Sequence, residues 1–490
     1  MEAVRRHGIM TAVEARDRSI PLSDPQSPQG KGLILTDENL TRNIWALAWP
    51  AVAENLLYTA VWFVDTLLIG WLRNPASLAA VSLGGLFAFI AESLFAALSV
   101  SAVALVARAW GAKKYDLGKR VGGQAITLAL LSAVAVMGLI WPNAERLMRL
   151  MGAEAEVVRL GSQYMRIVLL SSVFGFPLMV LNGILRGSGD TRTPMYITAV
   201  MNVWNVAAAY ALIFGPGPLP SLGVAGVAIA TASARVVGGG LAMWVVFTGR
   251  RTVKIEPRQV LQWDGRIVKE IVKLALPAAG ETLIMRAGSI AFVRIVSALG
   301  TASLAAHEIA ITVESMSFMP GFGLSIAATT LVGQSLGAKR PDLAERSIRT
   351  CMKYALIIMS GVAVLFALFG RQLVSVFGST PEVLHLASVA VRLAALEQWA
   401  MAVQMVLGGS LRGAGDTRSP MYVTMVGTFF FRIITVYLFA IAFRWGLAGV
   451  WRGTAVDWGG RAGLMYWMFR RGRWKTVRVL ETEGLGEGLG

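Results

Sequence analysis

Among the charged residues that stand inside long apolar stretches of this sequence, seven have a chemistry that needs an explanation. They are Glu54, Asp65, Glu92, Glu281, Arg286, Glu314 and Glu397. A charged side chain within hydrocarbon costs several kcal/mol unless it is paired or hydrated, so each of these residues is a functional hypothesis by default. Carboxylates in such surroundings can bind and release a proton or a metal cation. The chemistry that this set suggests is ion binding.

The stretches that hold these residues are long enough to cross a membrane. The chain has 490 residues, of which 55% are hydrophobic and only 15% are charged, which is outside the range of soluble proteins. Apolar runs of at least about 18 residues, the length that spans roughly 30 Å of hydrocarbon, recur along the chain. We predict twelve spans, at residues 44–72, 78–107, 121–141, 157–183, 193–214, 222–247, 268–299, 302–335, 346–369, 383–411, 419–443 and 446–469.

The basic residues between the spans indicate their orientation. With the N-terminus inside, roughly 32 Lys and Arg residues lie on the inner side and about six on the outer side, and this bias sets topology. Lys113, Lys254 and Arg470 are examples from the inner side, whereas Arg73 is on the outer side. We therefore expect a multi-pass protein of the cell membrane with both termini in the cytoplasm.

The composition excludes several other classes of protein. The net charge of +17 does not predict nucleic-acid binding, because the basic residues lie between apolar spans and form no continuous stripe. A single cysteine, Cys351, cannot form an internal disulfide, and no His/Cys cluster suggests a metal site or a cofactor. The N-terminal 43 residues have no apolar core, so we expect a disordered cytoplasmic tail and no signal peptide.

The two halves of the sequence repeat each other at an offset of 226 residues. LVARAWGAKKYDLGKR from Leu105 matches LVGQSLGAKRPDLAER from Leu331, and GILRGSGDTRTPMYIT from Gly183 matches GSLRGAGDTRSPMYVT from Gly409. Six spans is an even number, so both halves insert in the same direction, as in transporters whose halves rock around a central site. We expect a monomer divided into a tail (1–43), an N-lobe (44–247), a linker (248–267), a C-lobe (268–469) and a tail (470–490).

The doubled LRGxGDTR motif predicts a tight turn at the inner ends of two spans. Gly187, Gly189 and Asp190 break the helix, and we expect Arg186 and Arg192 to hold the turn at the anionic surface of the inner leaflet. The equivalent residues in the second half are Arg412, Gly413, Gly415 and Asp416. We interpret both turns as scaffold and gate.

These motifs, with the Pro50…Asp65-Thr66…Gly70 pattern and SFMPGFGLSIAATTLVGQSLGA, resemble the multidrug and toxic compound extrusion (MATE) family of prokaryotic type, over about residues 40–470. The resemblance implies an all-α integral membrane fold of twelve helices in two six-helix pseudo-symmetric lobes around a central cleft. It also implies export of small organic compounds, commonly cationic or amphiphilic, driven by the inward flow of protons or sodium ions. Such a protein is not an enzyme and needs no cofactor.

The resemblance gives two residues of the N-lobe a role in ion coupling. Asp65 matches the aspartate of the family's first helix, which takes up the coupling ion, and it lies about 10 Å from the outer end of its span. The alternative is that Arg166 neutralises it permanently. Asn205 matches a family asparagine, but Ala209 stands where a second aspartate is usual. Because a sodium site needs several converging oxygen ligands, we expect proton coupling over sodium coupling.

Glu54 lies three helical turns before Asp65 on nearly the same helix face, so we expect both to line one N-lobe cavity. The alternative is that Glu54 and its repeat partner Glu281 only form bonds across helices. Glu92 is a further candidate for the cleft or the ion site.

The C-lobe holds a second group of candidates. Some family members carry an acid on the tenth span where Met401 stands here, and Glu397 lies one turn earlier on the same face. Glu314, Glu397 and Arg286 fall at matching depth, so we expect them to form a charge pair or triad.

Two other functions are alternatives to export. A flippase for a lipid-linked saccharide precursor would be favoured by a cleft with several arginines, whereas the charges near the midplane are mostly acidic, which suits cations. A membrane-embedded enzyme would need a constellation of His, Asp or Ser near one interface. The three histidines, His7, His307 and His385, are scattered over the chain.

Overall fold

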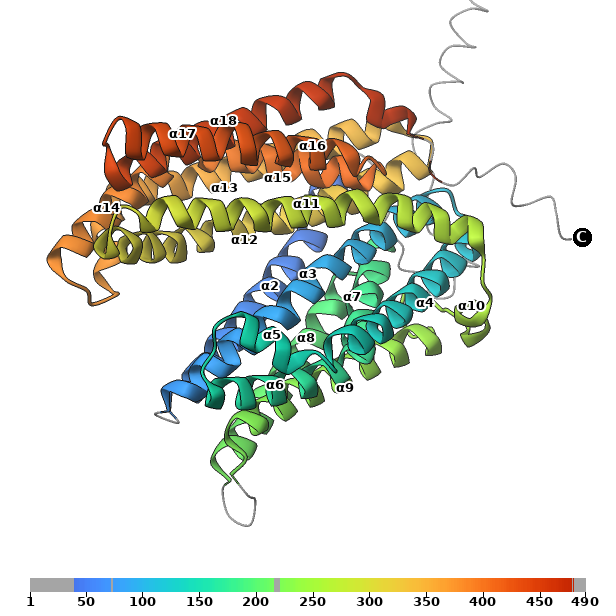
Figure 1. Ribbon diagram of the computed structural model, residues 1–490. Coiled ribbons are helices and arrows are strands. Elements are labelled where there is room, and N and C mark those ends of the chain that lie inside the picture. The colour runs from blue at the N-terminus through green and yellow to red at the C-terminus, as the bar shows by residue number, and fades with distance from the viewer. Residues whose placement is uncertain (1–38, 72–73, 216–220, 478, 480–490) are drawn as a thin grey trace, which may run out of the picture.

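The computed structural model describes residues 39–71, 74–215, 221–477 and 479, and in these ranges the chain contains helices and no strands. Almost all of the predicted N-terminal tail and most of the C-terminal tail lie outside the described residues. The helices form two bundles, blue to green and yellow-green to red in Figure 1, which lie together at the end that carries α10 and diverge toward the other end.

The N-lobe contains six predicted spans. They are α2 (Leu40–Gly70), α3 (Pro75–Gly111), α4 (Tyr115–Ile140), the pair α6 (Ala155–Leu170) and α7 (Ser172–Gly187), α8 (Arg192–Phe214) and α9 (Gly223–Thr248). The short α5 (Ala144–Leu150) precedes α6, and α10 (Pro257–Leu261) lies in the connection to the second bundle.

The C-lobe repeats this order. Its elements are α11 (Gly265–Ser297), α12 (Thr301–Gly337), α13 (Pro341–Ser375), α14 (Pro381–Ala394), α15 (Gln398–Gly413), α16 (Arg418–Val426), the π-helices η1 (Gly427–Ile433) and η2 (Leu438–Ala442) with α17 (Ile434–Tyr437) between them, α18 (Gly446–Arg470) and the 3₁₀-helix η3 (Arg473–Thr476).

Each predicted span corresponds to one helix or to one run of helices. Within the described ranges, eight helices are by themselves long and apolar enough to cross a membrane, and the bent pairs α6–α7 and α14–α15 bring the number to ten. The spans α11 and α18 complete two sets of six. They are more polar because they carry charges in mid-helix, Glu281 and Arg286 in α11 and Asp457 and Arg461 in α18.

Two spans that the sequence predicts as continuous helices are broken at equivalent points. The axis bends by 52° between α6 and α7 and by 54° between α14 and α15. At the first bend, the hydroxyls of Ser171 and Ser172 donate to the carbonyls of Val168 and Leu169, both at 2.6 Å. Such local bonds compete with the helical ones and bend helices. At the second bend stands Glu397, 226 residues after Ser171.

Several helix ends follow from local sequence. Asn74 precedes Pro75 at the start of α3, and its side chain accepts a bond from the Ala76 amide at 2.9 Å. The Asp264 carboxylate accepts from the Arg266 amide at 3.0 Å at the start of α11. These are the residues that satisfy the free amides of a first helical turn.

Pro50 shapes α2 and links it to the first LRGxGDTR turn. Because proline has no N–H, the Ala46 carbonyl loses its helical donor. The Thr191 hydroxyl of the turn donates to that carbonyl at 3.2 Å. A residue of the motif therefore fills the gap that Pro50 leaves.

The first helix of each lobe begins in the core of the opposite lobe. The start of α2 shares a core with α12, α13 and α15, through Leu40, Ile44, Leu47, Ala48, Leu324, Leu331 and Met401. The start of α11 joins the N-lobe core through Ile267, Ile271, Leu274, Ala275 and Ala278. Farther along, Leu68 of α2 packs in the N-lobe and Phe292 of α11 packs in the C-lobe. The two lobes are thus interleaved at these two helix starts.

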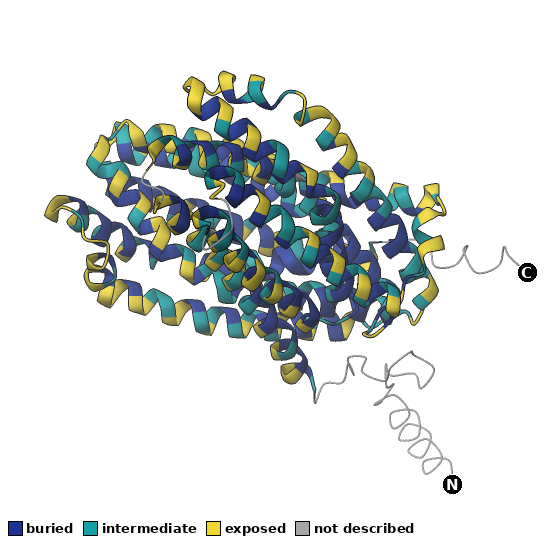
Figure 2. Ribbon diagram, turned by 90° about the horizontal axis from the view of Figure 1, so that it is seen from below, coloured by how far each residue is buried: buried dark blue, intermediate teal, exposed yellow. Residues whose placement is uncertain are grey.

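Large apolar side chains are exposed on the surface of the protein. Leu139, Val203 and Ile290 are 70%, 72% and 75% exposed, and exposed residues alternate with buried ones around the peripheral helices in Figure 2. Apolar surface of this extent is stable against hydrocarbon and not against water, as expected of a multi-pass membrane protein.

Candidate functional site

A charged cluster lies among α2, α3, α6 and α9 of the N-lobe. Arg235 on α9 forms an ion pair with Glu92 on α3. Asp65 on α2 lies within electrostatic reach of Arg235, and the buried Tyr164 on α6 interacts with all three charges. The cluster has two carboxylates for one guanidinium, so with both acids ionised it is one positive charge short of neutrality.

Unsatisfied oxygen atoms accompany this cluster. Asp65 Oδ1 and Asn205 Oδ1 are buried and have no hydrogen-bond partner within the described residues, whereas the Thr231 hydroxyl lies beside that of Tyr164. Asn205 is only 2% exposed and stands on α8, which packs against both α2 and α9. A buried polar atom without a partner is costly, and the oxygens of Asp65 and Asn205 could accept a proton donor or bind a cation.

The alternative that Arg166 neutralises Asp65 is wrong. Arg166 Nη2 bonds to Glu145 Oε1 at 3.1 Å, and its guanidinium lies 5.6 Å from the centre of the Trp141 ring. Arg166 therefore belongs to a partly exposed group with α5, and the guanidinium near Asp65 is that of Arg235. Depth along a helix, from which the pairing with Arg166 was inferred, does not specify which face a side chain occupies.

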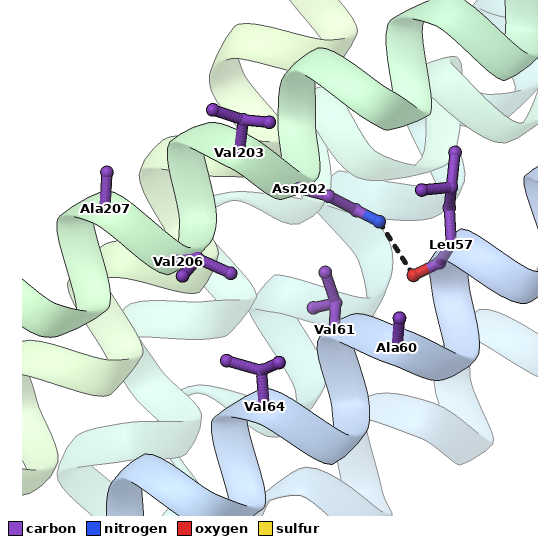
Figure 3. A pocket seen from close by; sticks show the side chains of 8 residues that line it. All are labelled: Leu57, Ala60, Val61, Val64, Asn202, Val203, Val206 and Ala207. Atoms are coloured by element: carbon purple, nitrogen blue, oxygen red, sulfur yellow. Dashed lines mark hydrogen bonds between the residues drawn. The ribbon is translucent and has the colours of Figure 1, made fainter.

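A pocket of about 460 Å³ lies between α2 and α8 (Figure 3). It is lined by Leu57, Ala60, Val61, Val64, Asn202, Val203, Val206 and Ala207. The amide of Asn202, the polar side chain of this lining, donates to the Leu57 carbonyl at 2.7 Å. The pocket therefore offers apolar contact and contains none of the charged candidates.

Glu54 and Glu281 are each bound to an arginine of the doubled motif. Glu54 Oε1 accepts from Arg186 Nη2 at 2.5 Å, and Glu281 Oε1 accepts from Arg412 Nη2 at 2.7 Å. The structure thus contains the bonds across helices that the alternative interpretation of Glu54 and Glu281 predicts. Glu54 and Asp65 have separate charged partners, Arg186 and Arg235, and the expectation that the two acids line one cavity stays a prediction.

The role expected for Arg186 also changes. Its side chain is only 20% exposed and its guanidinium turns inward to Glu54, so Arg186 does not hold the turn at a leaflet surface. The attraction of a buried carboxylate on α2 outweighs that of lipid headgroups, since an unpaired Glu54 would be expensive in this position.

The two motif turns have the same backbone geometry. Gly189 and Gly415 adopt φ values of 95° and 85°, a region that glycine reaches without steric cost. Asp190 accepts from the Thr193 amide at 2.9 Å and from its hydroxyl at 2.6 Å. Asp416 makes the same two bonds to Ser419, at 3.0 Å and 2.6 Å. Each turn thereby ends one helix and starts the next.

Gly187 and Gly413 allow these turns to approach a neighbouring helix closely. A Cβ atom at Gly187 would lie 2.8 Å from the Val103 carbonyl oxygen of α3, and one at Gly413 would collide with the backbone of α12 at Thr329. The motif's glycines are therefore needed for packing as well as for turning.

Hydrogen bonds connect the two lobes at these turns. Arg108 Nη2 on α3 donates to the Ala414 carbonyl at 3.0 Å, and Gln334 Nε2 on α12 donates to the Gly187 carbonyl at 3.0 Å. Arg108 and Gln334 are repeat partners at the offset of 226. Thr330 Oγ1 adds a bond to the Arg186 carbonyl at 3.0 Å. We call the bonds of Arg108, Gln334 and Thr330 the interlobe latch.

A second charged cluster is buried in the C-lobe. Asp457 is fully buried and accepts from Arg432 Nε at 2.7 Å and from Arg461 Nε at 2.6 Å. The carboxyl groups of Glu314 and Glu397 lie against each other, within electrostatic reach of Arg432. Three carboxylates therefore face two guanidiniums, the same deficit of one positive charge as in the N-lobe.

The predicted triad of Glu314, Glu397 and Arg286 is only partly correct. The two glutamates meet, but Arg286 is exposed and lies over the Phe89 ring of α3, 4.5 Å from its centre. Arg432 of η1 takes its place beside the glutamates. Arg286 thus faces the N-lobe, in agreement with the packing of α11 against α3.

The described residues contain no group of three or more His, Cys, Asp or Glu side chains that could hold a metal ion. Both clusters hold carboxylates, which can take up a proton or a cation.

The comparisons with known proteins agree with the repeat. The model of the MatE family matches this chain twice, at residues 50–211 and 277–438, which are the two halves. The chain belongs to the MATE family of efflux transporters.

Relatives of this MATE chain extend over nearly its whole length. It is 31% identical to the probable multidrug resistance protein NorM of Thermotoga maritima, over 91% of this chain and 96% of that protein. It is 30% identical to the multidrug resistance protein MdtK of Yersinia pestis, over 86% of this chain and 94% of that protein.

Solved MATE structures share the fold. A crystal structure described as MATE in the bent conformation superimposes with a TM-score of 0.83 at 24% identity, covering 89% of this chain and 97% of that one. A MOP superfamily transporter from Pyrococcus furiosus gives a TM-score of 0.82 at 24% identity, covering 90% and 97%. These likenesses support the two-lobe fold of the MATE chain.

Four charged residues of the MATE chain's buried clusters were missed from sequence: Arg235, Arg432, Asp457 and Arg461. All four stand in predicted spans, so the signal that identified the acids, a charge within an apolar stretch, applies to them equally. The arginines and Asp457 neutralise one another or their neighbours, and only the fold reveals these pairs.

Proposed function

We propose that this MATE protein is a secondary active antiporter that exports small organic compounds, cationic or amphiphilic, in exchange for protons flowing inward. Two relatives carry names that describe multidrug resistance, which supports organic drugs as the substrate class. The observation that carries the proposal is the N-lobe cluster, in which Asp65 has a buried, unpartnered oxygen beside the Glu92–Arg235 pair. One proton on Asp65 would balance the cluster's charge.

The coupling requires that the proton affinity of Asp65 differ between two states of the protein. Water, burial and neighbouring charges set the affinity of a carboxylate for its proton. A change in water access as the lobes move would therefore load the proton on one side and release it on the other. Asn205 stands on α8, which packs against α2 and α9, and its side-chain oxygen is buried without a partner in the described residues, so we propose that it accepts a hydrogen bond from protonated Asp65.

We infer that transport proceeds by alternating access, with residues 44–247 and 268–469 as the moving lobes. The interlobe latch supports this inference, because its bonds join side chains of one lobe to backbone carbonyls of the other. A neutral hydrogen bond contributes about 0.5–1.5 kcal/mol net and one from a charged donor about 1.5–3 kcal/mol. Bonds of this strength can break and re-form during a transport cycle.

We further propose that the protein works as a monomer in the cell membrane with both termini in the cytoplasm. The bias of Lys and Arg residues supports this orientation. It places the interlobe latch on the cytoplasmic side, so that the described conformation is closed to the cytoplasm and its lobes diverge toward the outside.

The proposal is tested with purified protein in liposomes loaded with ethidium. A pH gradient is imposed in potassium buffer without sodium, and a sodium gradient is imposed separately at equal pH. We expect efflux with the pH gradient alone. Asp65→Asn should reduce it at least about tenfold at near-normal expression, because the amide keeps the size and hydrogen bonding but takes up no proton.

The matched control is Glu145→Gln, which also converts an acid to an amide but breaks only the partly exposed ion pairs with Arg149 and Arg166, which are of small energetic value. It should leave efflux unchanged. Efflux driven by sodium alone, or full activity of Asp65→Asn, would refute the proposal.

A further inference from the structure

The N-lobe cluster contains one residue that a carboxylate site for a coupling ion does not need, Arg235. We propose that Arg235 determines ion specificity: its guanidinium is a built-in cation that occupies the N-lobe site, so that the site accepts a proton and excludes sodium. The inference rests on the proposed coupling role of Asp65 and names the residue that selects the ion.

The sequence argument against sodium was a shortage of oxygen ligands around Asp65. The structure supplies more of them than that argument assumed. Glu92 provides a second carboxylate in place of the aspartate missing at position 209, Asn205 Oδ1 is buried without a partner in the described chain, and the Thr231 hydroxyl lies beside that of Tyr164. Carboxylate, amide and hydroxyl oxygens are the ligands that hard cations prefer. Another feature must therefore exclude sodium.

Arg235 is that feature because its position is fixed from two directions. Its head is paired with Glu92, and its aliphatic stem passes over Gly175 of α7, where an added Cβ would lie 3.6 Å from Arg235 Cδ. A guanidinium stays protonated at any accessible pH. The cluster thus always contains one positive charge that cannot leave.

A permanent charge affects a proton and a sodium ion differently. A proton on Asp65 is bonded to the carboxyl oxygen and turns a charged group into a neutral one, which leaves the balanced Glu92–Arg235 pair beside it. A sodium ion keeps its charge and must share the same oxygens with the guanidinium, and like charges repel strongly where water is scarce. With Arg235 present, the oxygen-bearing side chains of this site therefore serve proton exchange. Without Arg235, the same side chains, those of Asp65, Glu92, Asn205 and Thr231, would serve sodium binding.

The groups that face Asp65 define the variants. Arg235 from α9 acts on Asp65, Tyr164 from α6 lies within electrostatic reach of Asp65, Glu92 and Arg235, and the neutral Asn205 stands on α8, which packs against α2 and α9. In Glu92→Gln, Asp65 becomes the nearest carboxylate to Arg235. The guanidinium then favours the ionised acid, and we expect the pH at which export is half-maximal to fall by about one unit or more.

The decisive variant is Arg235→Gln, with Arg235→Lys as its charge-conserving partner. The purified proteins are unfolded thermally in sodium chloride and in potassium chloride of equal ionic strength. A bound ion raises the midpoint, so Arg235→Gln should unfold at a higher temperature in sodium chloride, whereas the wild type and Arg235→Lys should show no difference. In liposomes, Arg235→Gln should gain ethidium efflux driven by a sodium gradient, at least tenfold above the wild-type rate.

Arg294→Gln is the matched control, since Arg294 is an exposed residue near the end of α11 and should change neither readout. If Arg235→Gln shows no sodium effect on unfolding and no sodium-driven efflux, the inference is wrong. If it does not fold, Glu92→Gln decides: an unshifted pH profile overturns the inference. A failure of the proposed function would give a different result, because Asp65→Asn would then export at the wild-type rate under a pH gradient.

Discussion

Glu54 and Arg186 form a buried ion pair, 2.5 Å between Oε1 and Nη2, directly after the point at which α2 leaves the core of the C-lobe. Glu281 and Arg412 repeat the arrangement at 2.7 Å on α11, which begins in the core of the N-lobe. Each pair fastens the first helix of a lobe to that lobe's own fourth span. We infer that the two pairs are pivots, because each helix is held by one lobe before the pair and by the other lobe after it.

Removal of one pivot charge should destabilise the protein. In Glu54→Gln, Arg186 keeps its charge without a carboxylate partner, and breaking a buried pair in this way costs about 3–5 kcal/mol. We expect a lower midpoint of thermal unfolding in detergent. Glu281→Gln should have a similar effect, since it breaks the equivalent pair. The double variant Glu54→Gln with Arg186→Gln should be more stable than Glu54→Gln alone, and equal stability of Glu54→Gln and wild type would contradict the pivot.

Loss of the interlobe latch should open the side on which the lobes meet. Arg108→Ala with Gln334→Ala removes the two symmetry-related bonds, together worth about 2–4 kcal/mol, so the balance between the two states should shift by more than tenfold. Amide hydrogen exchange of residues 186–191 and 412–417 should become faster. Gln124→Ala is the control, because Gln124 bonds to the linker carbonyl of Gln259 at 3.2 Å and not across the lobes. Unchanged exchange at both turns would rule out the latch.

Removal of the Arg432 guanidinium from the C-lobe cluster should make the thermal stability of the protein depend on pH. Arg432 is bound to Asp457 and lies beside Glu314 and Glu397. In Arg432→Gln these acids lose a counter-charge, so the folded state is favoured only when a carboxylate is protonated. We expect Arg432→Gln to unfold at a lower temperature than wild type at pH 8 and to recover stability toward pH 5. Equal losses at both pH values would show that Arg432 acts through packing alone.

Cysteine labelling tests the orientation. Cys351 is fully buried, and in a cysteine-free background Lys254→Cys and Glu154→Cys place single thiols at exposed positions at opposite ends of the lobes. A membrane-impermeant maleimide added to intact cells should label position 154 and not position 254. Labelling of position 254 from outside would reverse the proposed topology, and with it the statement that the described conformation is closed to the cytoplasm.

Much of the architecture could be predicted from the sequence, because apolar length and internal repetition are properties of the chain itself. Span length follows from the thickness of hydrocarbon, and the offset of 226 residues relates Gly189 to Gly415 and Glu54 to Glu281. The turns at Asp190 and Asp416 are local, since glycine and aspartate determine them within a few residues. The charged residues that matter were detectable for the same reason: each stands in an apolar run.

The partners of those charges were decided by the tertiary structure alone. Helical periodicity gives the depth of Asp65, Arg166 and Arg286, but the direction in which each side chain points depends on the rotation and packing of whole helices. Thus Arg166 bonds to Glu145, Arg286 lies over Phe89, and Arg235 stands beside Asp65. Ion pairing in a low-dielectric interior depends steeply on distance, and these distances arise only when helices far apart in sequence are brought together.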